Sequence, residues 1–153
     1  MPKKWITDRS EMDAILNETQ VGSFATVNPD GSPYVVTVNH VYHNGKIYFH
    51  CALKGKKLDN IKHNPRVCFE AHIIDRIVLA KKADDVSVRY CSVIVNGKAR
   101  IVDDPIAKMD ALIALSAKFT KDNNTDPPSD KCTSITGVVE IEIDEITGKK
   151  NVD

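Results

Sequence analysis

The stretch HCALKGKKLDNIKHNP, residues 50–65, runs from the end of an apolar strand into a short helix that begins with lysines. The first turn of a helix has unpaired N–H groups and a partial positive charge, so Lys54, Lys56 and Lys57 are unfavourable there unless an anion is bound. A phosphate at the helix start would balance this charge. The alternative is three solvated lysines on a surface turn, and these residues alone do not separate the two interpretations.

Strands and tight turns precede this stretch. Residues 21–27 alternate in the manner of a strand and end at the turn Asn28–Gly31, in which Pro and Gly supply the turn dihedrals. Residues 33–43 are rich in Val, Thr and Tyr and predict a second strand. Asn44-Gly45, a pair that favours a two-residue hairpin turn, leads from it into a third strand at 46–51.

The third strand and the helix after it expose different side chains. Alternation over residues 46–51 places the apolar side chains on one face and His50 on the other. His50 therefore leaves the apolar face just before the lysines. Leu58 and Ile61 are expected to anchor the helix to the core, and Pro65 ends it.

Further strands are predicted after the helix. Residues 67–71 alternate as a fourth strand, and 73–85 are expected to form a strand extension followed by an exposed loop. Residues 86–95 predict a fifth strand, which Asn96-Gly97 turns into a sixth at 98–102. This second hairpin would resemble the first.

Helices are predicted before and after these strands. A helix at 8–18 begins with Thr7 or Ser10 as its cap, and another begins at Pro105 after Asp103 or Asp104. The apolar stripe of the second consists of Ile106, Met109, Leu112, Ile113 and Phe119. A surface loop at 123–131 and a last strand at 139–143 complete the chain. The pattern predicts a mainly β protein, a six- to seven-stranded antiparallel β-barrel with flanking helices.

Composition limits the function. A chain of 153 residues that is 42% hydrophobic suits one domain spanning 1–153. Lys plus Arg (21) equals Asp plus Glu (21) and aromatics are 6%, so the chain lacks the basic groove and stacking surface of a nucleic-acid-binding barrel. The four cysteines form no C-x-x-C pair, and no segment resembles a signal peptide or membrane span. We expect a cytoplasmic protein with reduced thiols and no membrane partner.

Motifs of several enzyme classes are missing from the sequence. There is no nucleophile elbow, Walker loop or dinucleotide glycine fingerprint. The histidines show no metal-binding spacing, so each is more simply interpreted as exposed or hydrogen-bonded, and no metal site is predicted. They are His40, His43, His50, His63 and His72.

Several segments in order carry a family resemblance. They are YVVTVNHVY (34–42), GKIYFHCA (45–52), GKKLDNI (55–61), NPRVCF (64–69) and YCSVIVNGKAR (90–100). Together they resemble the flavin-binding split barrel of the pyridoxamine 5′-phosphate oxidase superfamily, and more closely its nitroimidazole-resistance branch. The likeness covers Ile6 to Ile143.

The resemblance implies FMN as the cofactor and a homodimer with the flavin at the subunit interface. The family's basic pair that holds the flavin phosphate falls on Lys56 and Lys57, and a polar residue contributed by the partner subunit falls on Ser92. The remaining cofactor-binding positions are Thr37, Val38, Asn39 and His40, which would lie along the flavin ring and contact it mostly through backbone groups, and His50, Cys51 and Ala52 at the phosphate. His50 is also the candidate catalytic residue, as a group that contacts substrate or adjusts the flavin.

Two departures from the family pattern bear on the reaction. Val36 and Val41 stand where the vitamin oxidases have an Arg and a Lys, and residues 145–153 lack their basic segment. Oxidation of pyridoxamine phosphate is therefore not expected. The resemblance favours an FMN-dependent oxidoreductase that passes electrons from a reduced nicotinamide or another donor to a small acceptor, such as a nitro compound. The alternatives are a non-catalytic flavin-binding or sensing protein, or a barrel that uses FAD, haem or a deazaflavin.

Overall fold

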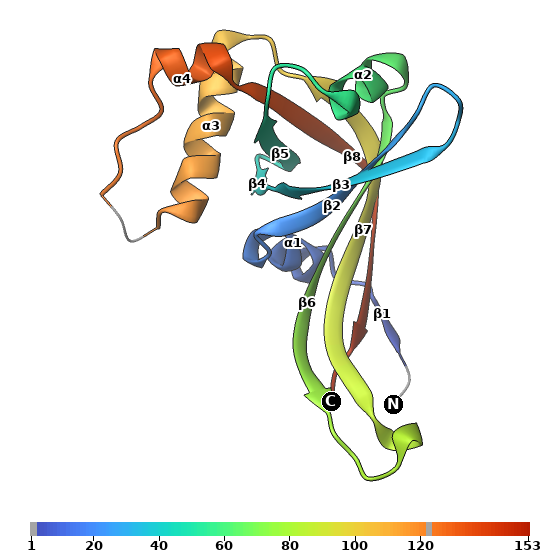
Figure 1. Ribbon diagram of the computed structural model, residues 1–153. Helices are drawn as coiled ribbons and strands as arrows, with labels where there is room; N and C mark the ends of the chain where they lie inside the picture. The colour runs from blue at the N-terminus through green and yellow to red at the C-terminus, as the bar shows by residue number, and fades with distance from the viewer. Residues whose placement is uncertain (1–2, 122–123) are drawn as a thin grey trace.

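The computed structural model describes residues 3–121 and 124–153 and contains one antiparallel eight-stranded sheet curled into a half-barrel with flanking helices (Figure 1). The mainly β barrel predicted from the sequence is confirmed. The strands are β1 (Lys4–Ile6), β2 (Val21–Val27), β3 (Pro33–Asn39), β4 (Val41–His43), β5 (Lys46–Cys51), β6 (Arg66–Val78), β7 (Ser87–Ile101) and β8 (Gly137–Asn151). The helices are α1 (Arg9–Glu18), α2 (Lys56–His63), α3 (Pro105–Phe119) and α4 (Asp130–Ile135), with a 3-10 turn at Ala83–Asp85.

The order of the strands explains why the sheet curls. It runs β3-β2-β6-β7-β8-β5-β4, and β1 pairs with β8 outside this path. β3 and β4 thus lie at opposite ends of the path, although only His40 separates them in the sequence. Because consecutive Cα atoms are about 3.8 Å apart, the two ends of the sheet must meet at this residue. The prediction of one strand over 33–43 is therefore wrong: the chain leaves one edge at Asn39 and joins the other at Val41.

His40 lies inside the core at this closure, with no exposed surface. Its Nε2 is 3.1 Å from the carbonyl oxygen of Leu16 and 3.3 Å from Oγ1 of Thr19. Its backbone N–H donates to the Gln20 carbonyl at 3.1 Å, and its own carbonyl accepts from Nζ of Lys118 at 2.8 Å. Burial, with a smaller effect of the Lys118 charge, lowers the pKa of His40 to about 4. The imidazole is therefore neutral at pH 7, and protonating it would put a charge in the core.

Acid is expected to destabilise the barrel through His40. The unfolded chain takes up a proton near pH 6.5, but the native imidazole does so only near its pKa of about 4, so stability falls as the pH drops through this window. The expected loss between pH 7 and pH 4 is about 3 kcal/mol. Urea unfolding at both pH values measures it. His40→Gln keeps a donor for Leu16 and should lose less on acidification, whereas equal losses in both proteins would contradict the assignment.

Helices α1 and α2 pack on the inner face of the sheet. Phe24, Phe49 and Phe69 are fully buried there, and the rings of Phe24 and Phe49 meet edge to face with their centroids 4.8 Å apart. Leu58 and Ile61 of α2 are 3% and 4% exposed, so their predicted anchoring role is confirmed. The predicted cap of α1 is wrong, because Asp8 rather than Thr7 or Ser10 accepts from the helix.

The core-facing side of α3 also differs from the prediction. The cap at Asp104 and the start at Pro105 are confirmed. Of the predicted stripe, however, Leu112 is buried whereas Ile106 is 82% exposed. The helix buries Ala111, Leu112 and Leu115 instead. Apolar residues surround most of α3, so periodicity alone does not select the face that packs against β4, β5 and β8.

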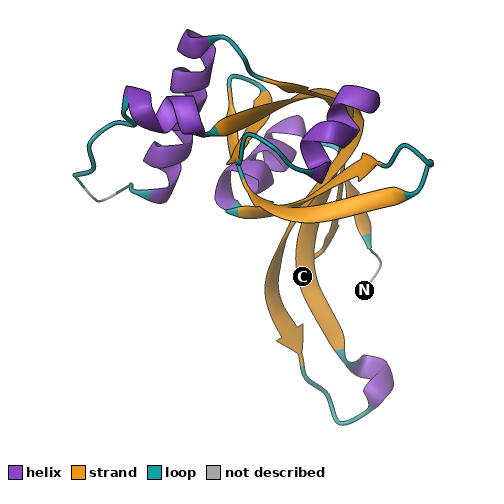
Figure 2. Ribbon diagram, turned by 45° about the horizontal axis from the view of Figure 1, so that its top comes forward, coloured by secondary structure: helices purple, strands orange, loops and turns teal. Residues whose placement is uncertain are grey.

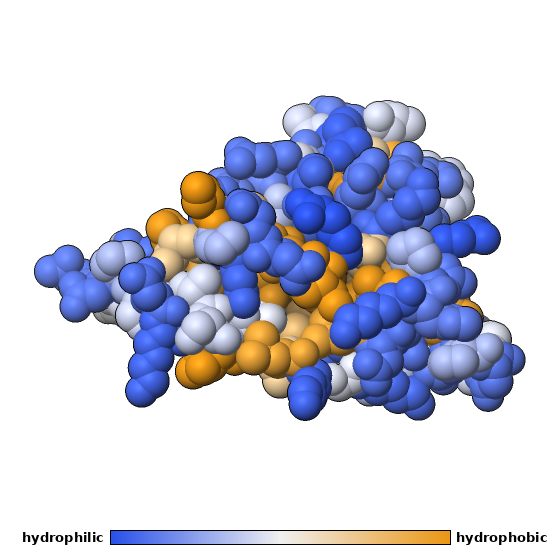
Figure 3. Space-filling model, turned by 90° about the horizontal axis from the view of Figure 1, so that it is seen from above, coloured by the Kyte–Doolittle hydropathy of each residue, from blue (hydrophilic) through white to orange (hydrophobic). Residues whose placement is uncertain are grey.

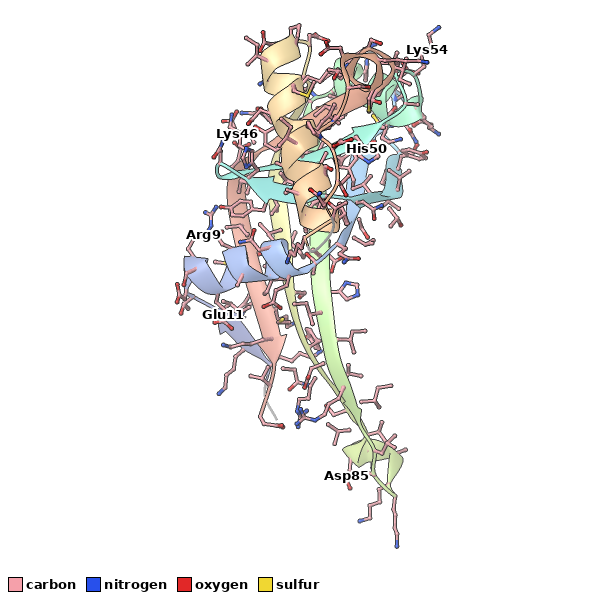
Figure 4. All side chains as sticks on the ribbon, turned by 90° about the vertical axis from the view of Figure 1, so that its left-hand side faces the viewer. Arg9, Glu11, Lys46, His50, Lys54 and Asp85 are labelled. Carbon is pink, nitrogen blue, oxygen red and sulfur yellow. The ribbon has the colours of Figure 1, made fainter. Side chains whose placement is uncertain are left out.

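The long strands β6 and β7 extend beyond the barrel as an arm, with Asp85 near its tip (Figure 4). The α-helices pack on the barrel rather than along this arm, and the tip of the arm carries the 3-10 turn (Figure 2). The strand extension and exposed loop predicted at 73–85 are confirmed, because β6 continues to Val78 before a loop. β6 and β8, which correspond to the predicted fourth strand and last strand, are longer than the ranges 67–71 and 139–143 that were predicted for them.

The hairpin predicted at Asn96-Gly97 is wrong. Both residues lie inside β7, at a register shift in its pairing with β8. A Cβ on Gly97 would lie 1.9 Å from the carbonyl oxygen of Glu142, so this glycine allows two backbones to approach closely rather than to turn. The predicted loop at 123–131 ends earlier than expected, because α4 begins at Asp130, and residue 123 lies outside the described residues.

Candidate functional site

Helix α2 begins without a side-chain cap. Gly55, at φ 154°, is the N-cap residue and supplies no side-chain acceptor. In α1, α3 and α4, by contrast, a side chain caps the helix start. The N–H groups of Leu58 and Asp59 both bond back to the Gly55 carbonyl at 3.1 Å. Those of Lys56 and Lys57 have no intrahelical acceptor, because they lie in the first turn. The start of α2 therefore presents two free N–H groups and two ammonium groups, a combination that suits a phosphate.

The two lysines lie on different sides of this helix start. Nζ of Lys56 is 4.7 Å from the centroid of the Tyr34 ring on β3. Burial raises the pKa of the Cys51 thiol on β5, and the charge of Lys57 opposes this rise. Lys54 is exposed, and its side chain points away from the molecule (Figure 4). The Lys56 ammonium thus lies beside β3, whereas the charge of Lys57 acts on the end of β5.

The predicted residues at the end of β5 follow the strand alternation. His50 is exposed and pairs with Val138 in the sheet, while Cys51 is half-buried next to it. Ala52 follows the strand and is exposed. His50 lies beside α3 (Figure 4). It is thus free to contact a ligand on the side of the barrel that α3 covers.

A pocket of about 440 Å³ brings Asn39 and His50 together. The two residues are distant in the sequence, but the ends of β3 and β5 meet where the barrel closes. The rest of the wall comes from α3, the segment after it and α4. We call this cavity the His50 pocket, and its lining consists of Asn39, His50, Leu112, Leu115, Ser116, Phe119, Asp126, Pro128, Cys132 and Thr136.

The predicted residues on β3 divide between the two faces of the sheet. Thr37 and Asn39 are exposed on the outer face. Val38 is 8% exposed and packs in the core, as does His40. The side chain of His40, its N–H and its carbonyl are all engaged within the protein. The structure therefore makes the side chains of Thr37 and Asn39, rather than those of Val38 and His40, accessible to a ligand.

Ser92 lies apart from the lysines within one chain. It pairs with His72 and Lys149 on β7, and its Oγ is 3.5 Å from the Lys149 carbonyl. Lys98 of the same strand pairs with Arg66, which follows α2, so Ser92 lies six residues, or about 20 Å, from the level of that helix. Ser92 alternates with the core-facing Val93 and shares the outer face of the sheet with Thr37 and Asn39.

This outer face exposes apolar side chains that none of the described helices covers. Its exposed hydrophobic residues include Val35 (62%), Ile74 (60%), Ile77 (61%) and Ile94 (44%). The helices that pack against β2, β6 and β7, α1 and α2, lie on the inner face instead. Large hydrophobic side chains exposed on one face in this way are available for contact with another molecule.

Sequence reasoning missed the contributions of Tyr34, α3 and α4 to the site. Tyr34 gave no signal, because an aromatic residue in a strand is ordinarily a packing residue. Leu112 and Phe119 were assigned to a core stripe, although both also line the His50 pocket.

Hydrophobic residues are exposed between hydrophilic ones on the face of the molecule seen from above (Figure 3).

Neither a metal site nor a membrane-spanning helix is found among the described residues. Within residues 3–121 and 124–153, no three His, Cys, Asp or Glu side chains come together in an arrangement that could hold a metal ion. None of the helices in these ranges has the length and hydrophobicity needed to cross a membrane.

Comparison with known proteins places the chain in a family. No curated protein matches it. Among solved structures it is similar to a putative 5-nitroimidazole antibiotic resistance protein from Bacteroides thetaiotaomicron, with 26% identity, a TM-score of 0.85 and coverage of 97% of this chain and 87% of the other. It shares a fold with an FAD and heme binding protein from Mycobacterium smegmatis (20% identity, TM-score 0.87, 98% and 74% covered) and an F420 reductase (24%, 0.59, 92% and 98%). A model of the family described as pyridoxamine 5′-phosphate oxidase matches residues 8–150, and the chain therefore belongs to that family.

Proposed function

We propose that this protein is an FMN-dependent oxidoreductase that transfers electrons from a reduced nicotinamide or another donor to a small acceptor, such as a nitro compound. The observation that carries the proposal is the start of α2, where two lysines and two free N–H groups occupy the first turn of a helix that has no capping side chain. Membership of the pyridoxamine 5′-phosphate oxidase family supports a redox role. The FAD and heme binding protein that has the same fold supports a flavin-type cofactor.

The residues around the α2 start fit a flavin phosphate. The N–H groups of Lys56 and Lys57 would donate to its oxygens, and the two ammonium groups would balance its charge. Tyr34 would hold the Lys56 side chain in place, because the ammonium lies 4.7 Å from its ring centroid. Lysine lacks the bidentate fork of arginine, so we expect the phosphate to be held by charge more than by fixed geometry.

Bound FMN would supply reversible electron uptake, while the protein binds and orients the reacting molecules. Thr37 and Asn39 offer polar side chains on the outer face of β3 for the flavin ring. His50 is exposed at the end of β5 and can donate or accept a hydrogen bond, so it is our candidate for contacting the substrate. Of the other predicted contacts, Cys51 and Ala52 would adjoin the phosphate.

A homodimer would complete the site. The uncovered outer face of the sheet carries apolar residues together with Thr37, Asn39 and Ser92. Pairing of this face with its copy would bury the apolar residues and bring the partner subunit's Ser92 toward the flavin bound by the first subunit. This arrangement would explain why Ser92 and the lysines lie apart within one chain.

Two valines support a reaction other than oxidation of pyridoxamine phosphate. Val36 packs against the core cluster and Val41 is 7% exposed. Neither position offers a cation to a phosphorylated substrate, in contrast to the Arg and Lys of the vitamin oxidases. The proposed substrate is therefore a small molecule that does not depend on these positions.

Spectroscopy and a reduction assay test the proposal. The purified protein should show flavin absorbance, or gain it when FMN is added, and bound flavin should be reduced by NADH or NADPH. An added nitro compound should then reoxidise it faster than it reoxidises free FMN. Failure to bind FMN, or a haem or F420 spectrum in its place, would contradict the cofactor. Binding without faster turnover would indicate a flavin-binding or sensing protein instead.

A further inference from the structure

The His50 pocket is lined by both apolar and polar side chains. Leu112 and Leu115 are apolar lining residues that are 5% and 2% exposed, so core packing holds them in position. Phe119 adds an aromatic ring to the lining. Asn39 and His50 are polar lining residues, and each can donate and accept hydrogen bonds. A flat ring would contact the leucines while one polar atom on it bonds to the amide or the imidazole.

The side chains that line the pocket disfavour anions. Of the described residues that line it, none is a lysine or an arginine, and Asp126 supplies a negative charge. The nearby ammonium of Lys118 already donates to the His40 carbonyl, so a phosphate or carboxylate would lose its hydration in the pocket without gaining an ion pair to a lysine or arginine of the lining. The lysines that suit a phosphate, Lys56 and Lys57, are not among the lining residues. The pocket and the α2 start thus differ in the ligand chemistry that they favour.

The size of the pocket sets the scale of its ligand. Its volume of about 440 Å³ lies toward the lower end of the range for small-molecule sites, about 300–1,000 Å³. We propose that the His50 pocket binds an uncharged aromatic or heteroaromatic molecule of one or two rings, and that this molecule is the substrate. The assignment of this molecule as the substrate rests on the proposed function, whereas its binding to the pocket does not.

Protection of Cys132 tests the pocket in the unmodified protein. Cys132 lines the pocket, whereas Cys68 and Cys91 do not. Saturating 4-nitrobenzyl alcohol, an uncharged probe, should slow the alkylation of Cys132 by iodoacetamide by about tenfold, because bound probe blocks access. The rates at Cys68 and Cys91, followed by peptide mass spectrometry, should not change. Equal protection at all three cysteines, or none at Cys132, would overturn the inference.

A matched anion tests the charge preference. 4-Nitrobenzoate has the same ring and nitro group but carries a carboxylate. At the same concentration it should leave the alkylation rate of Cys132 nearly unchanged, because Asp126 lines the pocket and no lysine or arginine among the described lining residues does. Protection by both probes to the same degree would show that the pocket does not select uncharged ligands.

Two neighbouring positions on α3 provide a matched pair of variants. Ser116 lines the pocket and is half-buried, whereas Ala117 is exposed and does not line it. Ser116→Phe should fill the pocket and raise the Kd for 4-nitrobenzyl alcohol, measured by equilibrium dialysis, by about tenfold or more. Ala117→Phe adds similar bulk on the solvent side and should change the Kd less than about twofold. Thermal unfolding checks that both variants fold, and equal effects on binding would contradict the assignment.

FMN titration separates this inference from the proposed function. Ser116→Phe is expected to bind FMN as the unmodified protein does. If Ser116→Phe lost the binding of FMN together with the binding of the probe, the pocket would hold the cofactor ring. This result would overturn the assignment of the pocket to the substrate but not the assignment of flavin as the cofactor. Conversely, the probe could protect Cys132 in an unmodified protein that binds no FMN. This result would refute the proposed function but would still support the inference that the pocket binds an uncharged ring.

Discussion

Replacing both Lys56 and Lys57 with alanine is expected to raise the Kd for FMN by about 100-fold or more and to leave the Kd for riboflavin within about twofold. The two ligands share the flavin ring and differ in the phosphate. Hydrogen bonds to charged groups contribute about 1.5–3 kcal/mol each, so the loss of two ammonium groups gives a change of this size. Fluorescence titration of each ligand into the apoprotein measures both constants.

Lys54→Ala is the matched control for this experiment. Lys54 lies on the same segment and carries the same charge, but it is exposed and points away from the molecule (Figure 4). Its loss should change FMN binding less than about threefold, since long-range attraction between exposed charges is screened by salt. Lys56→Arg keeps the charge and adds a bidentate fork, and should bind FMN at least as well as the unmodified protein. Equal weakening of FMN and riboflavin in the double variant would show that these lysines do not hold the phosphate.

The stretch at residues 50–65 was predictable because its signals are local. Leu58 and Ile61 mark the buried face of α2, and Gly55 and Pro65 mark its ends. The exposure of His50 follows from the alternation of β5 in the same way. These features depend on neighbouring residues in the sequence, so no knowledge of the rest of the fold was needed.

Features that depend on distant segments were not predictable. His40 interrupts the second strand because both edges of the sheet meet there, and nothing in residues 33–43 shows which edge each half joins. The His50 pocket likewise needs α3 to lie against β5. Since α3 is apolar on most sides, the sequence could not show that Leu112 and Phe119 face a cavity next to Asn39 and His50. The candidate site was thus predicted on the strands and α2 but missed on α3 and α4.

The two Asn-Gly pairs show how one local signal can have two outcomes. Asn44 and Gly45 have φ values of 52° and 76°, so they form the tight turn that was predicted. Asn96 and Gly97 have no positive φ and continue through β7. The difference comes from β8, which pairs with β7 on both sides of Gly97 and requires a residue without a Cβ at the register shift. The neighbouring strand, rather than the dipeptide, decides the conformation.

Gly97→Ala is therefore expected to cost about 3 kcal/mol or more in the free energy of unfolding. The added Cβ would lie 1.9 Å from the carbonyl oxygen of Glu142 and 3.0 Å from its carbonyl carbon. Backbone atoms cannot move aside as the end of a flexible side chain can, so β7 and β8 must separate locally. Urea unfolding, with the m value checked for two-state behaviour, measures the loss.

Gly31→Ala distinguishes this steric cost from the ordinary cost of replacing a turn glycine. Gly31 has a φ of 87°, and a Cβ added there would have no other atom within 4 Å, so alanine should cost about 1 kcal/mol through backbone strain alone. If Gly97 were in a hairpin turn, its replacement would cost about as much as that of Gly31. A cost at Gly97 no greater than at Gly31 would mean that β7 turns at this residue. A clearly larger cost would mean that β7 continues past it, because only then does the backbone of β8 stand where the new methyl group must go.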